Sequence, residues 1–504
     1  MSLSVFPHRL ALALGFALAA PLTSAPAQAA APTGTPEQRA AALVAQMSRE
    51  EKVAQAMNAA PAIPRLGIPA YEWWSEGLHG IARNGYATVF PQAIGLAASW
   101  NTQLMQQVGT VVSTEARAKF NQAGGPGKDH KRYAGLTIWS PNINIFRDPR
   151  WGRGMETYGE DPFLTGQLAV GFIRGLQGDD LEHPRTIATP KHIAVHSGPE
   201  PGRHGFDVDV SPRDVEATYT PAFRAALVEG QAGSVMCAYN SLHGTPACAA
   251  DWLLNGRVRG DWGFKGFVVS DCDAVDDMTQ FHYFRPDNAG SSAASLKAGH
   301  DLNCGTAYRA LGTAIERGEV DEALLDQSLV RLFAARYRLG ELQAPRKDRY
   351  ARLGAKDIDN AGNRALALQA AAESIVLLKN ANATLPLKAG TRLAVIGPNA
   401  DALAALEANY QGTSSQPVTP LLGLRQRFGA QQVRYAQGAP LAAGVPGMIP
   451  ETALRSDGKP GLRGEYFDNV ELEGAPRVTR QDRAISFNWD QVSPAKGVPA
   501  DRYA

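Results

Sequence analysis

Among the residues that can act as nucleophiles or acids, Asp271 has the most informative position, because it comes at the end of an apolar strand candidate. It directly follows the stretch from Gly266 to Ser270, whose apolar run Phe267-Val268-Val269 predicts a strand buried on both faces. A carboxylate at the end of such a strand costs desolvation free energy, which nearby hydrogen-bond donors or cations must offset. Held ionised in this way, Asp271 could act as a nucleophile in covalent catalysis.

Three basic residues after other candidate strands could supply these cations. Lys191 and His192 follow the stretch TIATP, and Arg153 lies in the loop DPRWGRG. A carboxylate surrounded by Lys, His and Arg suits the cleavage of glycosidic bonds, in which retaining enzymes keep a second carboxyl group about 5 to 5.5 Å away. The cations would also hold sugar hydroxyls. The alternative for each residue taken alone is a solvated loop or cap position.

The segment YEWWSEGLHG, residues 71–80, gives a second indication of sugar binding. Trp73 and Trp74 could stack on the faces of sugar rings, and Glu76 could accept hydrogen bonds from hydroxyl groups. The alternative is that the tryptophans form a hydrophobic staple at the rim of the fold.

The elements that must position these residues alternate between strand and helix patterns over residues 34–345. Such alternation suits a (β/α)8 barrel with added loops, since these barrels typically take about 250 residues. An open doubly wound sheet is the competing fold, but no GxGxxG motif follows a strand candidate. We therefore expect an α/β protein that begins with a (β/α)8 TIM-type barrel, with its active residues at the carboxyl ends of strands.

After the expected barrel, the composition and the pattern of polar and apolar residues change twice. A linker rich in Pro, Arg and Lys, residues 346–364, precedes a second α/β stretch, residues 365–455, which we expect to be an incomplete α/β sandwich domain. Over residues 461–504, polar and apolar residues alternate as in a β-domain. We expect there the start of an inserted β-module that the chain does not complete.

Residues 1–29 have the pattern of a signal peptide. A short positive start precedes an apolar run too short to span a bilayer, and Ala27-Gln28-Ala29 offers the small residues of a cleavage site. We expect an exported protein, periplasmic or secreted, without a membrane span. Its net charge of +1 gives no excess of basic residues of the kind that favours nucleic acid, so uncharged partners are expected.

Export permits disulfides, and four cysteines allow three pairings. We favour Cys237–Cys248, which closes a short loop, together with Cys272–Cys304; four buried thiols are the alternative. No close CxxC unit is present, so a zinc site is not expected.

Five motifs together resemble glycoside hydrolase family three, especially its xylosidase-like, plant-like branch. They are YEWWSEGLHG, PNINIFRDPRWGRGMETYGEDP, TPKH, VMCAYNSLHGTPACA and GFVVSDCDAV, and the resemblance covers roughly residues 35–460. It implies a retaining β-glycosidase with a barrel followed by an α/β sandwich. The segment after residue 461 resembles the start of a protective-antigen-type β-module. An oligosaccharide or glycoside substrate is implied, and neither a metal nor an organic cofactor.

Carried over position by position, the resemblance makes Asp271 of the VSD motif the nucleophile. The residues that match those holding the sugar in the first subsite are Arg153, Lys191, His192 and Tyr239.

Two further positions bear on which sugar fits. Glu76 stands where the family's glucosidases usually carry Asp, and Cys272 stands where many carry Trp. In the xylosidase-like branch, the longer Glu and a disulfide involving this cysteine crowd the space that a hexose hydroxymethyl group needs. The resemblance thus implies a β-xylosidase that releases xylose from the non-reducing end of β-xylo-oligosaccharides, with a β-glucosidase as the alternative.

The family's general acid/base has no counterpart in these motifs. It is usually a Glu in a glycine- and acid-rich loop of the second domain, and we expect it beyond residue 504, because no such loop precedes that residue. Another branch uses a His/Asp pair in the barrel, for which His196 or His204 could be proposed. Without an acid, the alternative is a carbohydrate-binding protein that does not turn over. The sequence does not indicate the oligomeric state.

Overall fold

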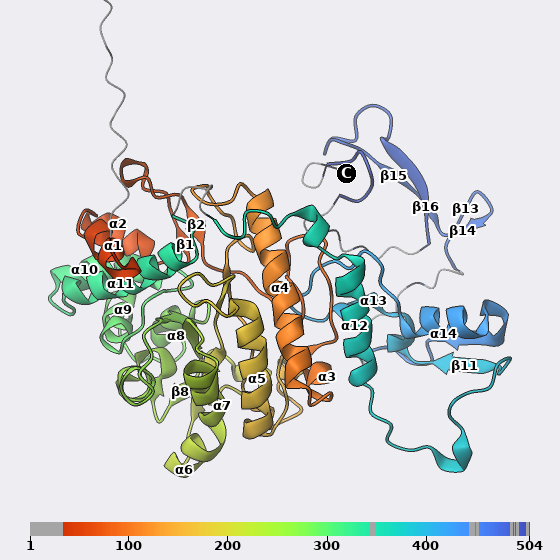
Figure 1. Cartoon of the computed structure of the whole chain (residues 1–504), viewed down its shortest axis with the longest axis horizontal. Coiled ribbons are helices and arrows are strands. Elements are labelled where there is room, and N and C mark those ends of the chain that lie inside the picture. The colour runs from red at the N-terminus through yellow and green to blue at the C-terminus, as the bar shows by residue number, and fades with distance from the viewer. Residues whose placement is uncertain are drawn as a thin grey trace, which may run out of the picture.

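The computed structural model describes residues 34–342, 348–442, 449, 453–483, 487, 489, 493–499 and 503. The signal peptide expected at residues 1–29 lies outside these described residues. In Figure 1, the chain up to about residue 340 forms a rounded body of helices around short strands, and the later residues lie to one side of it.

The strands at the centre of the first region are parallel. Strand β10 (Phe267–Ser270) pairs with β7 (Ser234–Cys237), which in turn pairs with β5 (Lys191–Ile193). Beside them, β3 (Thr137–Ile138) is parallel to β4 (Ile187–Ala188). Because parallel strands end at one edge, the side chains at their carboxyl ends gather there.

Isolated parallel bridges extend this arrangement on both sides. They join Asn142 to Lys191 and Val269 to Leu302. One pair departs from the all-parallel pattern of the expected barrel, because β1 (Ala59–Ala60) runs antiparallel to β2 (Tyr71–Glu72). Two further short strands, β8 (Ser241–Leu242) and β9 (Thr245–Pro246), form a hairpin beside β6 (Asp207–Val208).

The prediction of a strand buried on both faces is confirmed for β10. Phe267, Val268 and Val269 have no exposed surface, and Phe267 lies against the ring of Trp73, with the ring centroids 5.2 Å apart. Burial of this apolar strand fixes its register, and therefore the position of the residue that follows it.

Helices surround these strands, and α4 and α5 pack along each other in Figure 1. Asp161 caps α5 by accepting a hydrogen bond from the backbone N–H of Leu164 (2.6 Å), and Pro162 suits the first turn because a helix leaves that N–H unpaired. The helices are α1 Pro36–Val44, α2 Arg49–Gln55, α3 Ala93–Ala97, α4 Thr102–Gln122, α5 Pro162–Gln177, α6 Pro212–Asp214, α7 Pro221–Arg224, α8 Ala274–Gln280, α9 Asn288–Lys297, α10 Leu311–Glu316 and α11 Glu322–Arg338.

The second region follows the first from residue 348. It contains α12 (Ala361–Glu373), α13 (Leu403–Glu407) and α14 (Pro420–Phe428), with β11 (Leu393–Ile396) parallel to β12 (Val433–Ala436). The strands that come after them form two antiparallel pairs: β13 Arg455–Ser456 with β14 Lys459–Pro460, and β15 Leu462–Tyr466 with β16 Val478–Asp482.

The buried apolar side chains lie almost entirely in the first region. In the second region the apolar residues Ile375 and Leu378 are 79% and 91% exposed, so the described residues do not cover them. No helix in the described part of the chain combines the length and apolar character needed to cross a membrane.

Gly266 offers a test of the packing that holds β10. A Cβ atom at this position would lie 2.1 Å from the carbonyl oxygen of Gly233, the residue just before the neighbouring strand β7. We expect Gly266→Ala to lower the free energy of unfolding by about 1 to 3 kcal/mol, because backbone must move. Urea unfolding measures the change.

The matched control is Gly312→Ala in α10, where an added Cβ meets nothing within 4 Å. This substitution should leave stability unchanged or raise it by up to about 1 kcal/mol, because alanine is the better helix former. Equal losses in both variants would contradict the close approach of β10 and β7.

Candidate active site

Asp271 lies at the carboxyl end of β10, as predicted, and is 8% exposed. Its backbone N–H donates to the carbonyl of Cys237 (3.1 Å), which ties it to the end of β7. The carboxylate is held asymmetrically. Oδ1 accepts a hydrogen bond from the N–H of Cys272 (2.9 Å), whereas Oδ2 lies 3.2 Å from Nε2 of His192 and 3.5 Å from Nη1 of Arg153.

Arg153 is held by Glu156, a residue that the sequence did not single out. Its Nε and Nη2 donate to the two carboxylate oxygens at 3.1 and 2.8 Å, and both side chains are buried. Burial by itself would raise the pKa of Glu156, but the charge and hydrogen bonds of Arg153 outweigh it and lower that pKa to about 2. Asn142 and Asn409 also donate to this carboxylate, at 3.2 and 3.0 Å.

Lys191 contacts Glu76 rather than Asp271. The Nζ atom lies 2.7 Å from Oε1 of Glu76, and both side chains are 1% exposed. Burial raises the pKa of Glu76, and the Lys191 ammonium only partly opposes this effect. Of the three basic residues expected around Asp271, Arg153 and His192 therefore contact it, and Lys191 fixes the carboxylate predicted to bind sugar hydroxyls.

Tyr239 and His192 complete the predicted sugar-holding set. Tyr239 follows β7 and is 8% exposed, and its pKa is raised by burial and by the negative charge of Asp271. His192 lies within β5 and is fully buried; its pKa is lowered well below the ordinary value by burial and by the neighbouring Arg153. Two strands of one parallel sheet thus bring both side chains toward Asp271.

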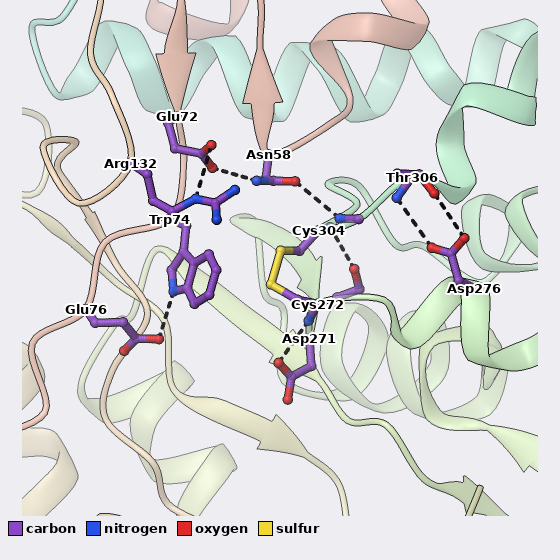
Figure 2. Close-up of a disulfide and its surroundings, with 12 residues drawn as sticks. Asn58, Glu72, Trp74, Glu76, Arg132, Asp271, Cys272, Asp276, Cys304 and Thr306 are labelled. Carbon is purple, nitrogen blue, oxygen red and sulfur yellow. Dashed lines mark hydrogen bonds and ion pairs between the residues drawn. A yellow bond between two sulfur atoms is a disulfide. The ribbon is translucent and has the colours of Figure 1, made fainter. Parts of the chain in front are cut away.

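The favoured disulfide pairing is confirmed, with Cys237–Cys248 and Cys272–Cys304 both formed. Figure 2 shows the second disulfide directly beside the Asp271 carboxylate, with Trp74 and Glu76 to one side of it. Trp74 donates from its Nε1 to Glu76 (3.1 Å). Cys272, one end of this disulfide, directly follows Asp271 in the sequence, and its backbone N–H donates to the Asp271 carboxylate.

The proposal that Trp73 stacks on sugar is wrong. This side chain is 1% exposed and packs edge-on against Tyr71 and Phe267, so it belongs to the core beneath β10. Trp74 points elsewhere and stacks on Trp139, with the ring centroids 5.7 Å apart. The two adjacent tryptophans serve different roles because neighbouring residues of an extended segment face opposite ways.

The second region contributes Tyr410, which no sequence motif singled out. The ring of Tyr410 lies over the ammonium of Lys191, with 4.6 Å between Nζ and the ring centroid. Its pKa is raised by burial and by the charge of Glu76. Because its neighbour Asn409 donates to Glu156, this loop contacts the site at two points.

The two histidines considered as acids have other partners. His196 is buried, its Nδ1 lies 3.3 Å from Oδ1 of Asn240, and burial lowers its pKa to about 3. His204 lies 2.7 Å from Asp277, whose hydrogen bond raises the pKa of the imidazole. A general acid must be protonated before it can give a proton to the leaving oxygen. Burial keeps His196 neutral, so it does not suit this role.

Models of two protein domains match this chain. The Glycosyl hydrolase family 3 N terminal domain matches residues 39–335, and the Glycosyl hydrolase family 3 C-terminal domain matches residues 375–495. Together they cover both regions described above.

Named relatives and solved structures are similar to the chain over most of its length. The xylan 1,4-beta-xylosidase of Xylanibacter ruminicola is 39% identical over 93% of this chain and 55% of its own length. The beta-xylosidase/alpha-L-arabinofuranosidase 2 of Medicago sativa is 42% identical over 76% of this chain and 51% of its own length. The chain thus spans about half the length of the curated relatives it matches.

A GH3 exo-beta-xylosidase solved with a xylobiose aziridine activity-based probe has a TM-score of 0.76 and 36% identity, covering 82% of this chain and 54% of its own. A β-glucosidase from Erythrobacter marinus has a TM-score of 0.70 and 29% identity, covering 82% of this chain and 60% of its own.

Proposed function

The chain belongs to glycosyl hydrolase family 3, and from this premise we propose that it is a retaining, exo-acting β-xylosidase. It would release xylose from the non-reducing end of β-xylo-oligosaccharides through a covalent bond between the sugar and Asp271. The observation that carries the proposal is the Asp271 carboxylate, which stands at the end of β10 with Oδ2 3.2 Å from His192 and 3.5 Å from Arg153.

In the proposed reaction, Oδ2 of Asp271 attacks the anomeric carbon as the glycosidic bond breaks. The hydroxyl groups of the sugar would be bound by Arg153, Lys191, His192 and Tyr239. Arg153 and Lys191 also pair with the neighbouring carboxylates of Glu156 and Glu76. A retaining enzyme also needs a group that protonates the leaving oxygen. We assign that role to neither Glu76 nor Glu156, since each is paired with a buried cation.

The direct test is the fate of xylobiose. Incubation should yield xylose whose first-formed anomer is β, read by proton NMR before mutarotation. A first-formed α anomer would contradict retention. Turnover of aryl β-xylosides with good leaving groups, without turnover of xylobiose, would identify an enzyme that lacks protonation of the leaving oxygen. Xylose binding without turnover of either substrate would instead support the carbohydrate-binding alternative.

The proposed preference for xylose rests on Glu76 and on the disulfide beside Asp271. Glu76 is held in place by Lys191 and Trp74, so its carboxylate cannot easily withdraw from the space that a hexose hydroxymethyl group would need. The β-glucosidases among the similar structures make glucose the competing sugar.

Shortening this side chain gives a measurable prediction. Glu76→Asp should raise the ratio of kcat/KM for aryl β-glucoside over aryl β-xyloside by about tenfold, because a pocket that crowds one small group is worth about 1 to 3 kcal/mol. The control is Glu72→Asp, a nearby buried carboxylate that binds Asn58 (2.6 Å). An unchanged ratio in Glu76→Asp would remove this residue from the account of specificity.

The finer features of architecture and location are part of the same proposal. We infer a (β/α)8-type barrel over residues 34–345, a linker over 346–364 and an α/β sandwich over 365–455. Residues 461–504 would begin an inserted protective-antigen-type β-module. Support comes from the parallel pairing of β5, β7 and β10 and from the antiparallel pairing of β15 and β16. Two disulfides support export to the periplasm or beyond.

A further inference from the structure

Asn144 holds His192 through three polar contacts. Its Oδ1 accepts a hydrogen bond from the backbone N–H of His192 (2.9 Å) and lies 2.8 Å from Nδ1 of the ring. Its Nδ2 donates to the carbonyl oxygen of His192 (2.8 Å). Both side chains are buried, and the parallel bridge between Asn142 and Lys191 brings the two segments together.

The two backbone contacts fix the orientation of the Asn144 amide. The opposite orientation would place the NH2 group against an N–H donor and the oxygen against a carbonyl, and both contacts are repulsive. Oδ1 therefore faces the imidazole. Because an amide oxygen can only accept, Nδ1 of His192 must carry a hydrogen atom.

The other ring nitrogen, Nε2, consequently carries no hydrogen and can only accept a hydrogen bond. Burial and the positive charges of Arg153 and Lys191 keep the imidazole of His192 neutral, since they lower its pKa well below the ordinary value. A neutral imidazole carries only one hydrogen, which already lies on Nδ1. Nε2 thus presents a lone pair 3.2 Å from Oδ2 of Asp271, and no described residue donates a hydrogen bond to either atom.

Two lone pairs at this distance repel each other unless a donor lies between or beside them. A sugar hydroxyl can be that donor for Nε2. A protonated imidazole, by contrast, would donate from Nε2 to Oδ2 and occupy the electron pair that nucleophilic attack requires. The tautomer of His192 therefore decides whether Asp271 is available.

We propose that Asn144 is a positioning residue that locks His192 in the Nδ1–H tautomer. His192 then offers an acceptor at Nε2 to a hydroxyl of the sugar in the first subsite and donates no hydrogen bond to Oδ2 of Asp271. In the covalent step, an electron pair of Oδ2 forms the bond to the anomeric carbon, and the leaving oxygen departs with the pair of the broken C–O bond. The inference rests on the proposed function and deepens the role of that site.

Histidine NMR reads the tautomer without any turnover. In protein labelled with 15N-histidine, the His192 signal, identified by its loss in His192→Gln, should show a protonated Nδ1 and a bare Nε2 at neutral pH. A hydrogen on Nε2, or on both nitrogens, would overturn the proposal. This measurement needs no variant at position 144, so it decides the matter even if substitutions there prevent folding.

Asn144→Asp extends the test through the pH profile. A carboxylate beside Nδ1 stabilises the imidazolium, so His192 should become protonated at a pH at least about one unit higher than in the parent, a tenfold change in the protonated fraction at a given pH. The other charged and titratable groups around His192 are Asp271, Arg153, Lys191, His196 and Arg203, and all of them are unchanged by the substitution.

The rate of covalent labelling by a 2-fluoro-β-xyloside with a dinitrophenolate leaving group should follow this titration. Because the leaving group needs no proton, the fall in labelling rate at low pH (the acid limb) reports the protonation of His192. In Asn144→Asp this acid limb should move to higher pH by the same amount as the His192 titration. The control is Asn121→Asp, which adds an equal charge in α4 and should leave the limb unmoved. An unmoved limb in Asn144→Asp would overturn the proposal. Failure of the parent to label at any pH would count against the proposed function, while the histidine spectrum still decides the role of Asn144.

Discussion

Asp271→Ala is expected to abolish covalent labelling by a 2-fluoro-β-xyloside and to lower the hydrolysis of aryl β-xylosides by about 10⁴-fold or more. The variant lacks the oxygen that we propose forms the bond to the anomeric carbon, and loss of a nucleophile typically has effects of this order. Intact-mass spectrometry measures the gain of a single fluorosugar, and peptide mapping should locate it on Asp271 in the parent. A fluorosugar on the alanine variant would contradict the assignment.

Asp273→Asn is the matched control for this experiment. Asp273 is the next carboxylate along the chain, and its backbone has a φ of 69°, in the left-handed region that asparagine tolerates well. Its backbone N–H donates to the carbonyl of Cys304 (2.8 Å), a contact that the substitution preserves. Labelling should therefore persist. Loss of labelling in Asp273→Asn, with labelling retained in Asp271→Ala, would exchange the roles of the two aspartates.

Glu156→Gln is expected to slow labelling by about 100-fold and to lower the free energy of unfolding by about 3 kcal/mol. Removing the carboxylate leaves Arg153 buried without its bidentate partner, and breaking one side of a buried pair is strongly destabilising. The guanidinium is then expected to move toward Oδ2 of Asp271, now 3.5 Å away, where a small displacement would misalign the proposed nucleophile. Labelling kinetics and urea unfolding measure the two effects.

The same pair predicts how stability depends on pH. The native pKa of Glu156 is lowered to about 2, because Arg153 outweighs the effect of burial, while an unfolded glutamate titrates near about 4.3. The stabilisation is therefore fully present above the unfolded value and is lost as the pH falls from about 4 toward 2. Glu156→Gln should lack this component of acid sensitivity.

Glu341→Gln separates loss of stability from loss of alignment. Glu341 also forms a buried bidentate pair, with Arg336 at 2.7 and 2.9 Å, but it contacts none of the residues around Asp271 among the contacts of the described chain. It should cost similar stability and leave the labelling rate of the folded protein unchanged. Equal slowing in both glutamine variants would reduce the role of Glu156 to folding alone.

The position of Asp271 could be predicted from the sequence because a fully buried strand leaves a continuous apolar run that points to the residue after it. Arg153 and His192 were proposed because they follow candidate strands, whereas Tyr239 was found only through the family motifs, since a single polar residue at a strand end has no signature of its own. The pairing of Cys272 with Cys304 was favoured in advance and is confirmed.

Other parts of the site could not be predicted for physical reasons. Trp73 and Trp74 look alike in sequence, and only the packing against Phe267 separates the core side chain from the other. Glu156 lies three residues after Arg153 in the same motif, so their spacing was the one available signal. Asn409 bonds to Glu156 across 253 residues, and no local pattern reports a contact at that separation.

The loop of residues 409–413 makes the first region depend on the second, because it belongs to the second region and contacts the site in the first. Its backbone pairs with the first region, where the N–H of Ala87 donates to the carbonyl of Thr413 (3.0 Å) and Thr413 donates back to Gly85 (3.2 Å). A recombinant fragment ending at residue 342 would keep Asp271 and its neighbours, but it would lose the Tyr410 ring over Lys191. Exchanging the first and second regions between homologues should therefore alter ligand recognition even where every residue of the first region is retained.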